Sequence, residues 1–407
     1  FDELLELFEK IKNTVSEHQG CEPLFKDEDD YQQFVARHNQ QAVAANDLNT
    51  YKGNAYLGID AGSTTTKLVL IDEANRILYS HYTSNLGNPV DVVLDQLKVI
   101  YAAANKDMKI QSSCVTGYGE DLIKSAFHVD HGIVETIAHF NAARYFNPNV
   151  DFILDIGGQD MKAIWLENGV ITNILLNEAC SSGCGSFLEN FASSLHIPTK
   201  EIAKTAFSSK NPAVLGSRCT VFMNSGIITE QRNGRTSEDI MAGLCRSIIE
   251  NVFTQVIRVS NLDSLGKKIV VQGGTFENDA VLRAMEEYVG RDVVRAPYPG
   301  IMGAIGMALI AKEKYEKSPE TEEIWDLQNL DTFSYTQDAN SPCPFCGNHC
   351  NRTIVKFSNG NSWVTNNRCE RGEVIGNPKD KEVNRQVKEK LQKVNAVPNL
   401  YKIREEL

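Results

Sequence analysis

Residues 58–72 (GIDAGSTTTKLVLID) place an acidic side chain, a glycine and a run of hydroxyl groups close together in the chain. Gly62 lets the backbone approach an anion, and Asp60, at the end of an expected strand, can hold Mg²⁺ through water. Lys67 either adds a positive charge to this site or lies on the exposed face of the following strand. An ordinary hairpin is the alternative, but an acid followed so closely by G-S-T-T-T is unusual for a plain turn. The expected phosphate donors are three hydroxyl side chains and their amides: Ser63, Thr64 and Thr65.

Two later segments, 155–160 (DIGGQD) and 270–278 (VVQGGTFEN), carry related patterns. Asp155 suits a metal ion or the positioning of water, and either Gln159 or Asp160 can orient an attacking water molecule. The glycine pair of the later segment is expected at a strand-to-helix turn, where the backbone can pass close to a flat base or a ribose. The residues assigned to nucleotide binding from these two segments are Gly157, Gly158, Gly273, Gly274 and Asn278.

The elements that must position these residues follow from apolar runs and turn residues. A strand-turn-strand opening occurs twice, which predicts two related α/β halves with a cleft between them. The expected strands are 55–60, 67–72, 77–83, 110–116, 151–155, 161–166, 170–175 and 268–272. The expected helices are 89–104, 134–146, 185–195, 199–206, 223–232, 237–260, 278–289 and 301–314.

From about Tyr56 to Ala311 the sequence resembles the actin, sugar-kinase and heat-shock ATPase superfamily. This resemblance implies an actin-like α/β fold with two ribonuclease H-like lobes that close around ATP and Mg²⁺. Glu135, in the segment 132–139 (GIVETIAH), falls where that superfamily has its first connecting helix. It is a candidate for polarising water, and a simple helix-cap or surface acid is the alternative.

Two cysteines have a setting that a sugar kinase would not need. Cys180 precedes a Gly-rich turn and a helix, and Cys219 precedes another helix. Partial positive charge at a helix N-terminus lowers the pKa of a thiol and favours an anionic ligand set. A [4Fe–4S] cluster needs four thiolates, and a two-fold homodimer sharing one cluster would supply them. Two buried structural cysteines are the alternative.

These motifs resemble the activators, or archerases, of 2-hydroxyacyl-CoA dehydratases and the ATPase subunits of benzoyl-CoA reductase. The resemblance implies cluster ligands at Cys180 and Cys219 and phosphate loops at 60–67 and 155–160. It implies anaerobic, ATP-driven delivery of low-potential electrons from a ferredoxin or flavodoxin to a partner iron–sulfur dehydratase or reductase. Cys184 departs from the family pattern and is either a core thiol or an alternative ligand. The competing classes are a small-molecule (sugar or acid) kinase of the same fold and a non-catalytic assembly or sensor protein.

The segment 343–350 (CPFCGNHC) and a later cysteine form the pattern C-x2-C-x3-C-x18-C. The first C-x2-C resembles a metal knuckle, but the usual second C-x2-C is missing. His349 can replace one ligand, and free thiols in a small hairpin domain are the alternative. The expected ligands of Zn²⁺ or of a second iron–sulfur cluster are Cys343, Cys346, Cys350 and Cys369.

Composition sets the broad class. A hydrophobic fraction of 42% and a charged fraction of 23% are typical of globular proteins. The net charge of −12 argues against a general nucleic-acid binder, because a phosphate backbone favours a basic face. No run of 18 apolar residues occurs, so no membrane span is expected. Ten cysteines without a secretory signal favour reduced thiols in a cytoplasmic protein. The expected units are a helical N-terminal extension (1–52), an ATPase domain (53–314, with lobes 53–148 plus 299–314 and 149–298), a linker (315–340) and a Cys-rich region (341–407).

Overall fold

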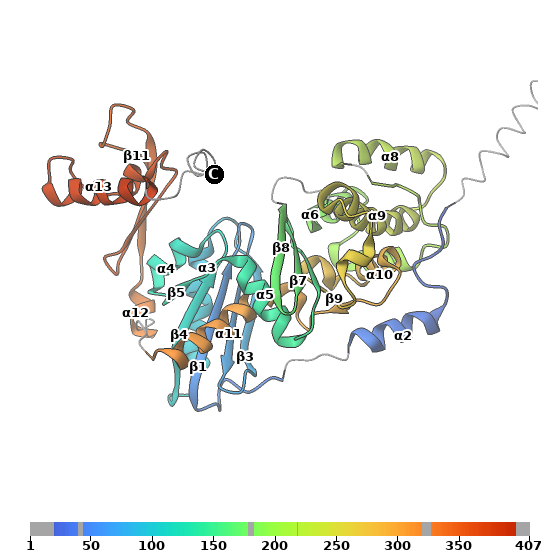
Figure 1. The fold of residues 1–407 in the computed structure, drawn as a ribbon, viewed down its shortest axis with the longest axis horizontal. Helices are drawn as coiled ribbons and strands as arrows, with labels where there is room; N and C mark the ends of the chain where they lie inside the picture. Colours follow the sequence, from blue (N-terminus) through green and yellow to red (C-terminus); the bar gives the residue numbers. More distant parts are fainter. Residues whose placement is uncertain (1–19, 40–43, 178–182, 218, 320–326, 396–407) are drawn as a thin grey trace, which may run out of the picture.

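The computed structural model describes residues 20–39, 44–177, 183–217, 219–319 and 327–395. In this part of the chain, two five-stranded sheets with helices around them stand next to each other (Figure 1). We call the unit around the first sheet the first lobe and the unit around the second sheet the second lobe. A three-stranded sheet with its own helix extends from one end of the first lobe, and Val355 and Phe357 of this sheet join the core of that lobe. The mixed α/β class that the sequence predicts is therefore confirmed.

The two large sheets follow the same plan. The strand order is β3-β2-β1-β4-β5 in the first lobe and, read from the same end, β8-β7-β6-β9-β10 in the second. In each sheet the first strand pairs antiparallel with the second and parallel with the fourth. The strands are β1 (Gly53–Ala61), β2 (Thr65–Asp72), β3 (Ile77–Ser84), β4 (Met108–Thr116), β5 (His131–Gly132), β6 (Phe152–Ile156), β7 (Met161–Glu167), β8 (Val170–Asn177), β9 (Ile269–Gln272) and β10 (Val294–Arg295).

Helices surround both sheets, and two of them, α5 and α11, pack against each other where the lobes meet (Figure 1). In the first lobe and at this junction the helices are α3 (Pro89–Ala103), α4 (Glu120–Phe127), α5 (Glu135–Phe146), η6 (Pro299–Ile301) and α11 (Met302–Lys317). In the second lobe they are α6 (Gly185–Ser194), η2 (Thr199–Glu201), α7 (Ile202–Phe207), α8 (Thr220–Arg232), α9 (Ser237–Asn251), η3 (Val252–Ile257), η4 (Leu262–Leu265), η5 (Gly274–Glu277) and α10 (Asp279–Val289).

Glycines allow α11 to approach its neighbours closely. A Cβ atom on Gly306 would lie 2.0 Å from the carbonyl oxygen of Ala138 in α5. On the sheet side, a Cβ atom on Gly58 of β1 would lie 2.0 Å from the carbonyl oxygen of Ala304. Any side chain at either position would push the elements apart, because protein interiors are close-packed. These glycines therefore help to hold the start of α5 next to the end of β1.

Residues 20–39 pack on the second lobe, and residues 44–51 lie on the first. Helix α2 (Glu28–His38) begins at the N-cap Asp27 and packs on the second lobe, where Leu24 and Phe34 join the hydrophobic core with 1% and 2% exposure. Further along, Ala45 forms a parallel bridge with Ile77 of the first lobe. Helix α2 lies within the N-terminal extension that is expected to be helical (1–52), and residues 1–19 of that extension lie outside the described residues.

The C-terminal part differs from the sequence prediction. The prediction of a linker at 315–340 is wrong from residue 327 onward. Residues 327–342 form α12 (Leu327–Thr332) and β11 (Tyr335–Pro342). Leu330 and Phe333 are buried in the core of the first lobe, while the edge strand β11 is mostly exposed and so lacks an apolar pattern. The remaining elements are β12 (Asn351–Phe357), β13 (Ser362–Thr365), η7 (Glu370–Glu373) and α13 (Lys381–Asn395).

One helical segment of the described chain, Ser237–Ile257, is long and apolar enough to cross a membrane. It comprises α9 and η3, and 72% of its apolar window is buried within the second lobe. Burial of this extent is typical of the central helix of a folded domain.

Candidate nucleotide site

A cleft of about 520 Å³ opens between the two lobes. Its walls are the turns after β1, β6 and β9 together with the first turn of α5. These segments are far apart in the sequence, and they meet around one space as a nucleotide site between two lobes requires. The sequence-predicted residues that line it are Asp60, Gly62, Ser63, Thr64, Thr65, Lys67, Glu135, Asp155, Gly157, Gly158, Gln159, Asp160, Gly273 and Gly274.

The turns after β1 and β6 have matching backbone bonds. The amide of Gly62 donates to the carbonyl of Thr65 at 2.9 Å, and the amide of Gly157 donates to the carbonyl of Asp160 at 2.9 Å. A Cβ atom on Gly157 would lie 2.5 Å from Oδ1 of Asp160, so a side chain there would displace this carboxylate from its place in the turn. Each lobe thus offers a tight, glycine-containing turn to the cleft, of the kind whose backbone amides bind phosphate.

A second pair of glycines is also matched between the lobes. Gly117 follows β4 with φ +91°, and Gly273 follows β9 with φ +92°. A Cβ atom on Gly117 would lie 2.6 Å from the carbonyl oxygen of Ala61, and one on Gly273 would lie 2.3 Å from that of Ile156. Both positions require glycine, for its backbone conformation and for the close approach to the neighbouring strand. Gly117 was not identified from the sequence, although aligning VTGYG with VQGGT would have found it.

The mouth of the cleft brings side chains of the two turns together. Oγ of Ser63 donates to Oε1 of Gln159 at 3.4 Å, which joins the first lobe to the second. Nζ of Lys67 lies 5.8 Å from the ring centroid of Tyr82, which also lines the cleft. Tyr82 supplies a half-exposed aromatic face there.

Asp60 and Lys67 form an ion pair within the first lobe. The two residues lie opposite each other in the β1–β2 register, and Nζ of Lys67 is 3.1 Å from Oδ2 of Asp60. Burial alone would lower the pKa of Lys67, but the charge of Asp60 raises it above the ordinary value. The side chain of Lys67 is only 14% exposed. It therefore lies in the cleft and not on an exposed strand face.

The second lobe has a larger buried network, in which His139 of α5 connects two acids. Nδ1 of His139 lies 2.6 Å from Oδ2 of Asp155 and 3.0 Å from Nε2 of Gln272. Nε2 faces Glu135 at 3.4 Å, a distance of ionic contact. Burial would lower the pKa of His139, but the charge of Asp155 dominates and raises it to about 10. The same partnership holds the pKa of Asp155 below its ordinary value despite burial.

Lys162 completes this network from β7. Its Nζ lies 3.0 Å from Oε1 of Glu135, and it also contacts Asp160. Burial opposes the charge on Lys162, but Asp155, Glu135 and Asp160 together raise its pKa well above the ordinary value. Burial would likewise raise the pKa of Glu135, yet His139 and Lys162 hold it far below the usual range. Glu135 is therefore a charged group of the cleft, and not a surface acid.

Several residues of the cleft were not identified from the sequence, and one prediction does not hold. The side-chain oxygen of Asn278 accepts hydrogen bonds from the amides of Ala280 and Val281, so it caps α10 and does not line the cleft. Lys162 could have been found from the repeat, since it stands after Asp155 at the separation that Lys67 has from Asp60. The lining residues that the sequence did not indicate are Tyr82, Ser84, Tyr118, His139, Ser186, Glu189, Pro299 and Gly300.

The structure describes one of the two cysteines predicted to bind the cluster. Cys219 is the N-cap residue of α8 and its thiol is exposed. Cys180 lies outside the described residues. Cys184 is fully buried in the core of the second lobe, as a core thiol would be.

The four C-terminal cysteines do not form a zinc-like group. Cys343 donates its amide to the carbonyl of Cys350 at 2.9 Å, which closes the loop that carries three of them. Tetrahedral Zn²⁺ with Zn–S bonds of about 2.3 Å would hold its thiols at roughly 3.8 Å from one another. Within the described ranges, the one set of three potential metal ligands within 4.8 Å of each other is elsewhere, in the cleft.

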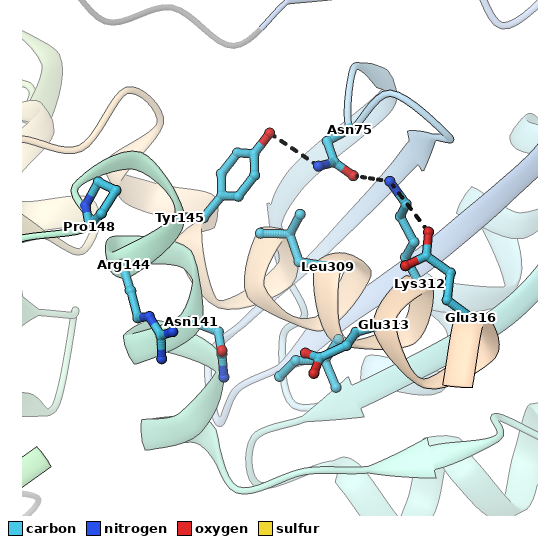
Figure 2. A pocket seen from close by; sticks show the side chains of 10 residues that line it. Asn75, Asn141, Arg144, Tyr145, Pro148, Leu309, Lys312, Glu313 and Glu316 are labelled. Atoms are coloured by element: carbon cyan, nitrogen blue, oxygen red, sulfur yellow. Dashed lines mark hydrogen bonds and ion pairs between the residues drawn. The ribbon is translucent and has the colours of Figure 1, made fainter. Parts of the chain in front are cut away.

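A second hollow of about 520 Å³ lies beside α5 and α11 and shares no lining residue with the cleft. Figure 2 shows Tyr145, Asn75 and Lys312 joined in a row of hydrogen bonds at its edge. Lys312 also pairs with Glu316 in this hollow, which lies apart from the residues of the cleft.

Comparison with known proteins shows which family the two-lobed part of the chain belongs to. A family model described as the BadF/BadG/BcrA/BcrD ATPase family matches residues 57–311. The chain belongs to this ATPase family. The (R)-2-hydroxyglutaryl-CoA dehydratase activating ATPase of Acidaminococcus fermentans is 32% identical over 267 residues, which cover 64% of this chain and 98% of that protein. The 2-hydroxyisocaproyl-CoA dehydratase activator of Clostridioides difficile is 31% identical over 265 residues, which cover 64% of this chain and 96% of that protein.

A solved structure of this ATPase family gives the same result. The activator of the 2-hydroxyisocaproyl-CoA dehydratase from Clostridium difficile with bound ADPNP superposes with a TM-score of 0.58 and 30% identity, covering 67% of this chain and 99% of that one. The resemblance expected from the sequence is confirmed, and the chain is an ATPase. The family match begins after α2 and ends within α11, so α2 and the three-stranded sheet lie outside it.

Proposed function

We propose that this ATPase is an electron-transfer activator that works as a homodimer with one shared [4Fe–4S] cluster. Its partner would be an iron–sulfur enzyme of the 2-hydroxyacyl-CoA dehydratase or benzoyl-CoA reductase type, and its donor a ferredoxin or flavodoxin. The observation that carries this proposal is the exposed thiol of Cys219 at the start of α8, in a chain whose ATPase relatives are dehydratase activators.

The nucleotide part rests on the geometry of the cleft. ATP, with ADP as its product, would place its phosphates between the glycine turns of the two lobes, where amides and hydroxyls can donate to them. Asp60 and Asp155 would hold the accompanying Mg²⁺, either directly or through water. Glu135 and Gln159 would orient the attacking water, since both face the cleft from different lobes. Nucleotide shifts the closure of the lobes only by its different affinity for the open and closed states.

The cluster part rests on the setting of Cys219. Its side chain is exposed at the N-terminus of a 13-residue helix, where partial positive charge favours an anionic group such as a thiolate-ligated cluster. Phe222, one turn further on, is 66% exposed, which suits a contact with a second copy. These features fit a ligand shared across a two-fold axis, with Cys180 as the expected second ligand of each subunit. When bound, a [4Fe–4S] cluster would supply one-electron chemistry at low potential.

The C-terminal cysteines are proposed as a separate metal site. Cys343, Cys346, Cys350 and Cys369 lie on one loop and on the turn before η7. Because the thiols do not lie at tetrahedral zinc spacing, binding of Zn²⁺ would require the loop to close, whereas a second iron–sulfur cluster is a larger group. Metal analysis of the purified chain decides between them.

The test is anaerobic purification followed by iron, sulfide and zinc analysis and measurement of the molecular mass. We expect a dimer, and we expect Cys219→Ser to lose about four irons per dimer, the content of one [4Fe–4S] cluster. Cys21→Ser, which changes a half-buried thiol on the second lobe, is the matched control and should keep them. A small-molecule kinase would keep its activity in Cys219→Ser, and a sensor would show no turnover stimulated by a partner. Either result would contradict the electron-transfer function.

A further inference from the structure

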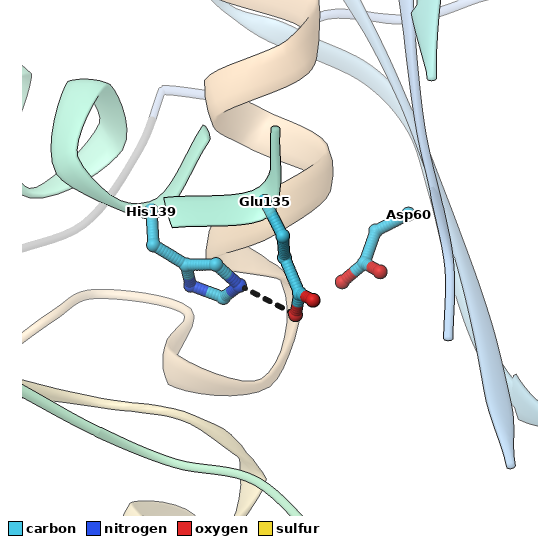
Figure 3. A group of neighbouring side chains, drawn as sticks. All are labelled: Asp60, Glu135 and His139. Carbon is cyan, nitrogen blue, oxygen red and sulfur yellow. Dashed lines mark ion pairs between the residues drawn. The ribbon is translucent and has the colours of Figure 1, made fainter. Parts of the chain in front are cut away.

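Three potential metal ligands converge where the end of β1 faces the first turns of α5. Figure 3 shows Asp60, Glu135 and His139 pointing toward one another. One ligand atom of each lies within 4.8 Å of the other two. In the part of the chain that the structure describes, no other three His, Cys, Asp or Glu side chains gather in this way.

Two atoms of this group are buried without a hydrogen bond. Oδ1 of Asp60 and Nε2 of His139 have no hydrogen-bond partner among the described residues, although the two residues are only 2% and 6% exposed. The nearest carboxylate oxygen to Nε2 is Oε1 of Glu135 at 3.4 Å. Leaving buried polar atoms unsatisfied is costly, and native proteins rarely do so. The arrangement therefore calls for a further group between these side chains.

The other ring nitrogen of His139, Nδ1, has the kind of carboxylate partner that metal-binding histidines usually have. Nδ1 lies 2.6 Å from Oδ2 of Asp155, which can accept its proton in a strong hydrogen bond. A histidine that binds a metal through one nitrogen almost always donates the other N–H to a carboxylate or carbonyl. A metal ion would take the place of the proton on Nε2, and with the remaining proton on Nδ1 the lone pair of Nε2 is directed toward Asp60 and Glu135. Nε2 of Gln272 donates to Oδ2 of Asp155 at 3.1 Å and to the backbone carbonyl of His139 at 3.4 Å, which holds the carboxylate against the ring.

The place between the ligands is kept open by a glycine. A Cβ atom on Gly303 of α11 would lie 2.7 Å from Oδ2 of Asp60 and 3.1 Å from Nε2 of His139. The local charge also favours a cation. Four carboxylates face two lysines around this point, so one negative charge remains even when the imidazole is protonated. These groups are Asp60, Glu135, Asp155 and Asp160 with Lys67 and Lys162.

We propose that Asp60, Glu135 and His139 form a binding site for a divalent first-row transition-metal ion, held by direct side-chain contact in the absence of nucleotide. An imidazole ligand favours Mn²⁺, Fe²⁺ or Co²⁺ over Mg²⁺, which prefers oxygen ligands and retains several waters. The ion would be set beside the phosphate turns before nucleotide arrives. This inference adds a cation to the proposed nucleotide site but does not depend on ATP hydrolysis or on the cluster.

Titration of the full-length chain with Mn²⁺, without nucleotide and after removal of bound metals, tests the proposal. Mn²⁺ is the probe because carboxylate and imidazole suit it and thiolates do not, so the cysteines do not compete. Loss of the free Mn²⁺ signal in electron paramagnetic resonance gives the affinity. Pulsed resonance of the bound ion then reports a nitrogen ligand directly, in the wild type, without any variant.

We expect about one Mn²⁺ per chain with a nitrogen coupling. His139→Gln should weaken binding by about 100-fold or more, since loss of a residue that only supports a ligand already costs 10- to 100-fold. The matched control is His38→Gln, which changes another buried histidine paired to a glutamate, Glu286 at 2.9 Å, outside the cleft. The Mn²⁺ affinity of His38→Gln should stay within twofold of the wild-type affinity. Absence of bound Mn²⁺ in the wild type, a bound ion without nitrogen coupling, equal losses in the two variants, or displacement by equimolar Mg²⁺ would each overturn the proposal.

Discussion

The two lobes repeat the same acid–lysine pair but use it differently. In the first lobe, Asp60 and Lys67 lie opposite each other across β1 and β2 and bind directly. In the second lobe, Asp155 and Lys162 hold the same register across β6 and β7, yet Asp155 binds His139, and Lys162 reaches Glu135. The difference comes from α5, whose first turns place two side chains between the partners. The first lobe therefore carries a closed pair, whereas the charges of the second lobe also tie it to the helix that joins the lobes.

This contrast predicts its largest effect at the lysines. Lys162→Met would leave Glu135 and Asp160 without their buried counter-charge, and removal of one partner from a buried pair costs about 3–5 kcal/mol. Lys67→Met would free a single carboxylate, with a loss of about 1–3 kcal/mol. Urea unfolding without nucleotide measures both, and ATP hydrolysis should fall in both variants. Equal losses of stability would mean that the second network is no more than a copy of the first.

The matched glycines should show a smaller difference. Gly273→Ala and Gly117→Ala force a Cβ atom into φ near +90°, at a cost of about 1–3 kcal/mol. The loss should be larger at Gly273, where the neighbouring carbonyl oxygen is closer. Gly290→Ala is the control, because its φ is also positive but nothing lies within 4 Å. Urea unfolding measures these losses. If Gly273→Ala lost no more stability than this control, the close approach of Gly273 to the carbonyl oxygen of Ile156 would not contribute to stability.

The thiols of the two lobes provide a comparison of reactivity. Cys114 in β4 and Cys245 in α9 are each fully buried, and burial raises the pKa of each to about 12. Only about 10⁻⁴ of either thiol is therefore ionised at pH 8, and the thiolate is the reactive form. Iodoacetamide followed by mass spectrometry should modify Cys219 at least about 100-fold faster than both. Rapid modification of Cys114 alone would show that the first lobe opens more readily than the second.

The smallest effect is expected where the turns touch. Ser63→Ala removes the 3.4 Å contact with Gln159, an exposed hydrogen bond between the lobes. Surface changes of this kind stay within about 0.5 kcal/mol, so urea unfolding should barely change. A loss above about 1 kcal/mol would mean that this contact holds the lobes together.

Much of the cleft could be predicted because its signals are local. Acid-glycine turns at strand ends and apolar runs are visible within a few residues, and the repeat places them in pairs. His139 could not be assigned this way, since its role depends on Asp155, which follows it on another element, and on α11 from much later in the chain. Asn278 was misassigned because the same amide oxygen can serve a ligand or a helix end. The strand β11 was missed because an exposed edge strand has no apolar alternation.

The N-terminal segment around α2 affects how the ATPase unit can be isolated. Leu24 and Phe34 complete the interior of the second lobe, and Glu286, whose side chain is only 5% exposed, contacts Arg37 at 2.8 Å and His38 at 2.9 Å. The family match covers residues 57–311, so it excludes Leu24, Phe34, Arg37 and His38 but includes Glu286. A chain trimmed to that match would lose two core side chains and leave the buried Glu286 with only the more distant Arg283, at 3.8 Å. The apolar surface uncovered in this way would favour aggregation. The smallest self-sufficient folding unit of this protein is thus larger than its recognisable ATPase sequence.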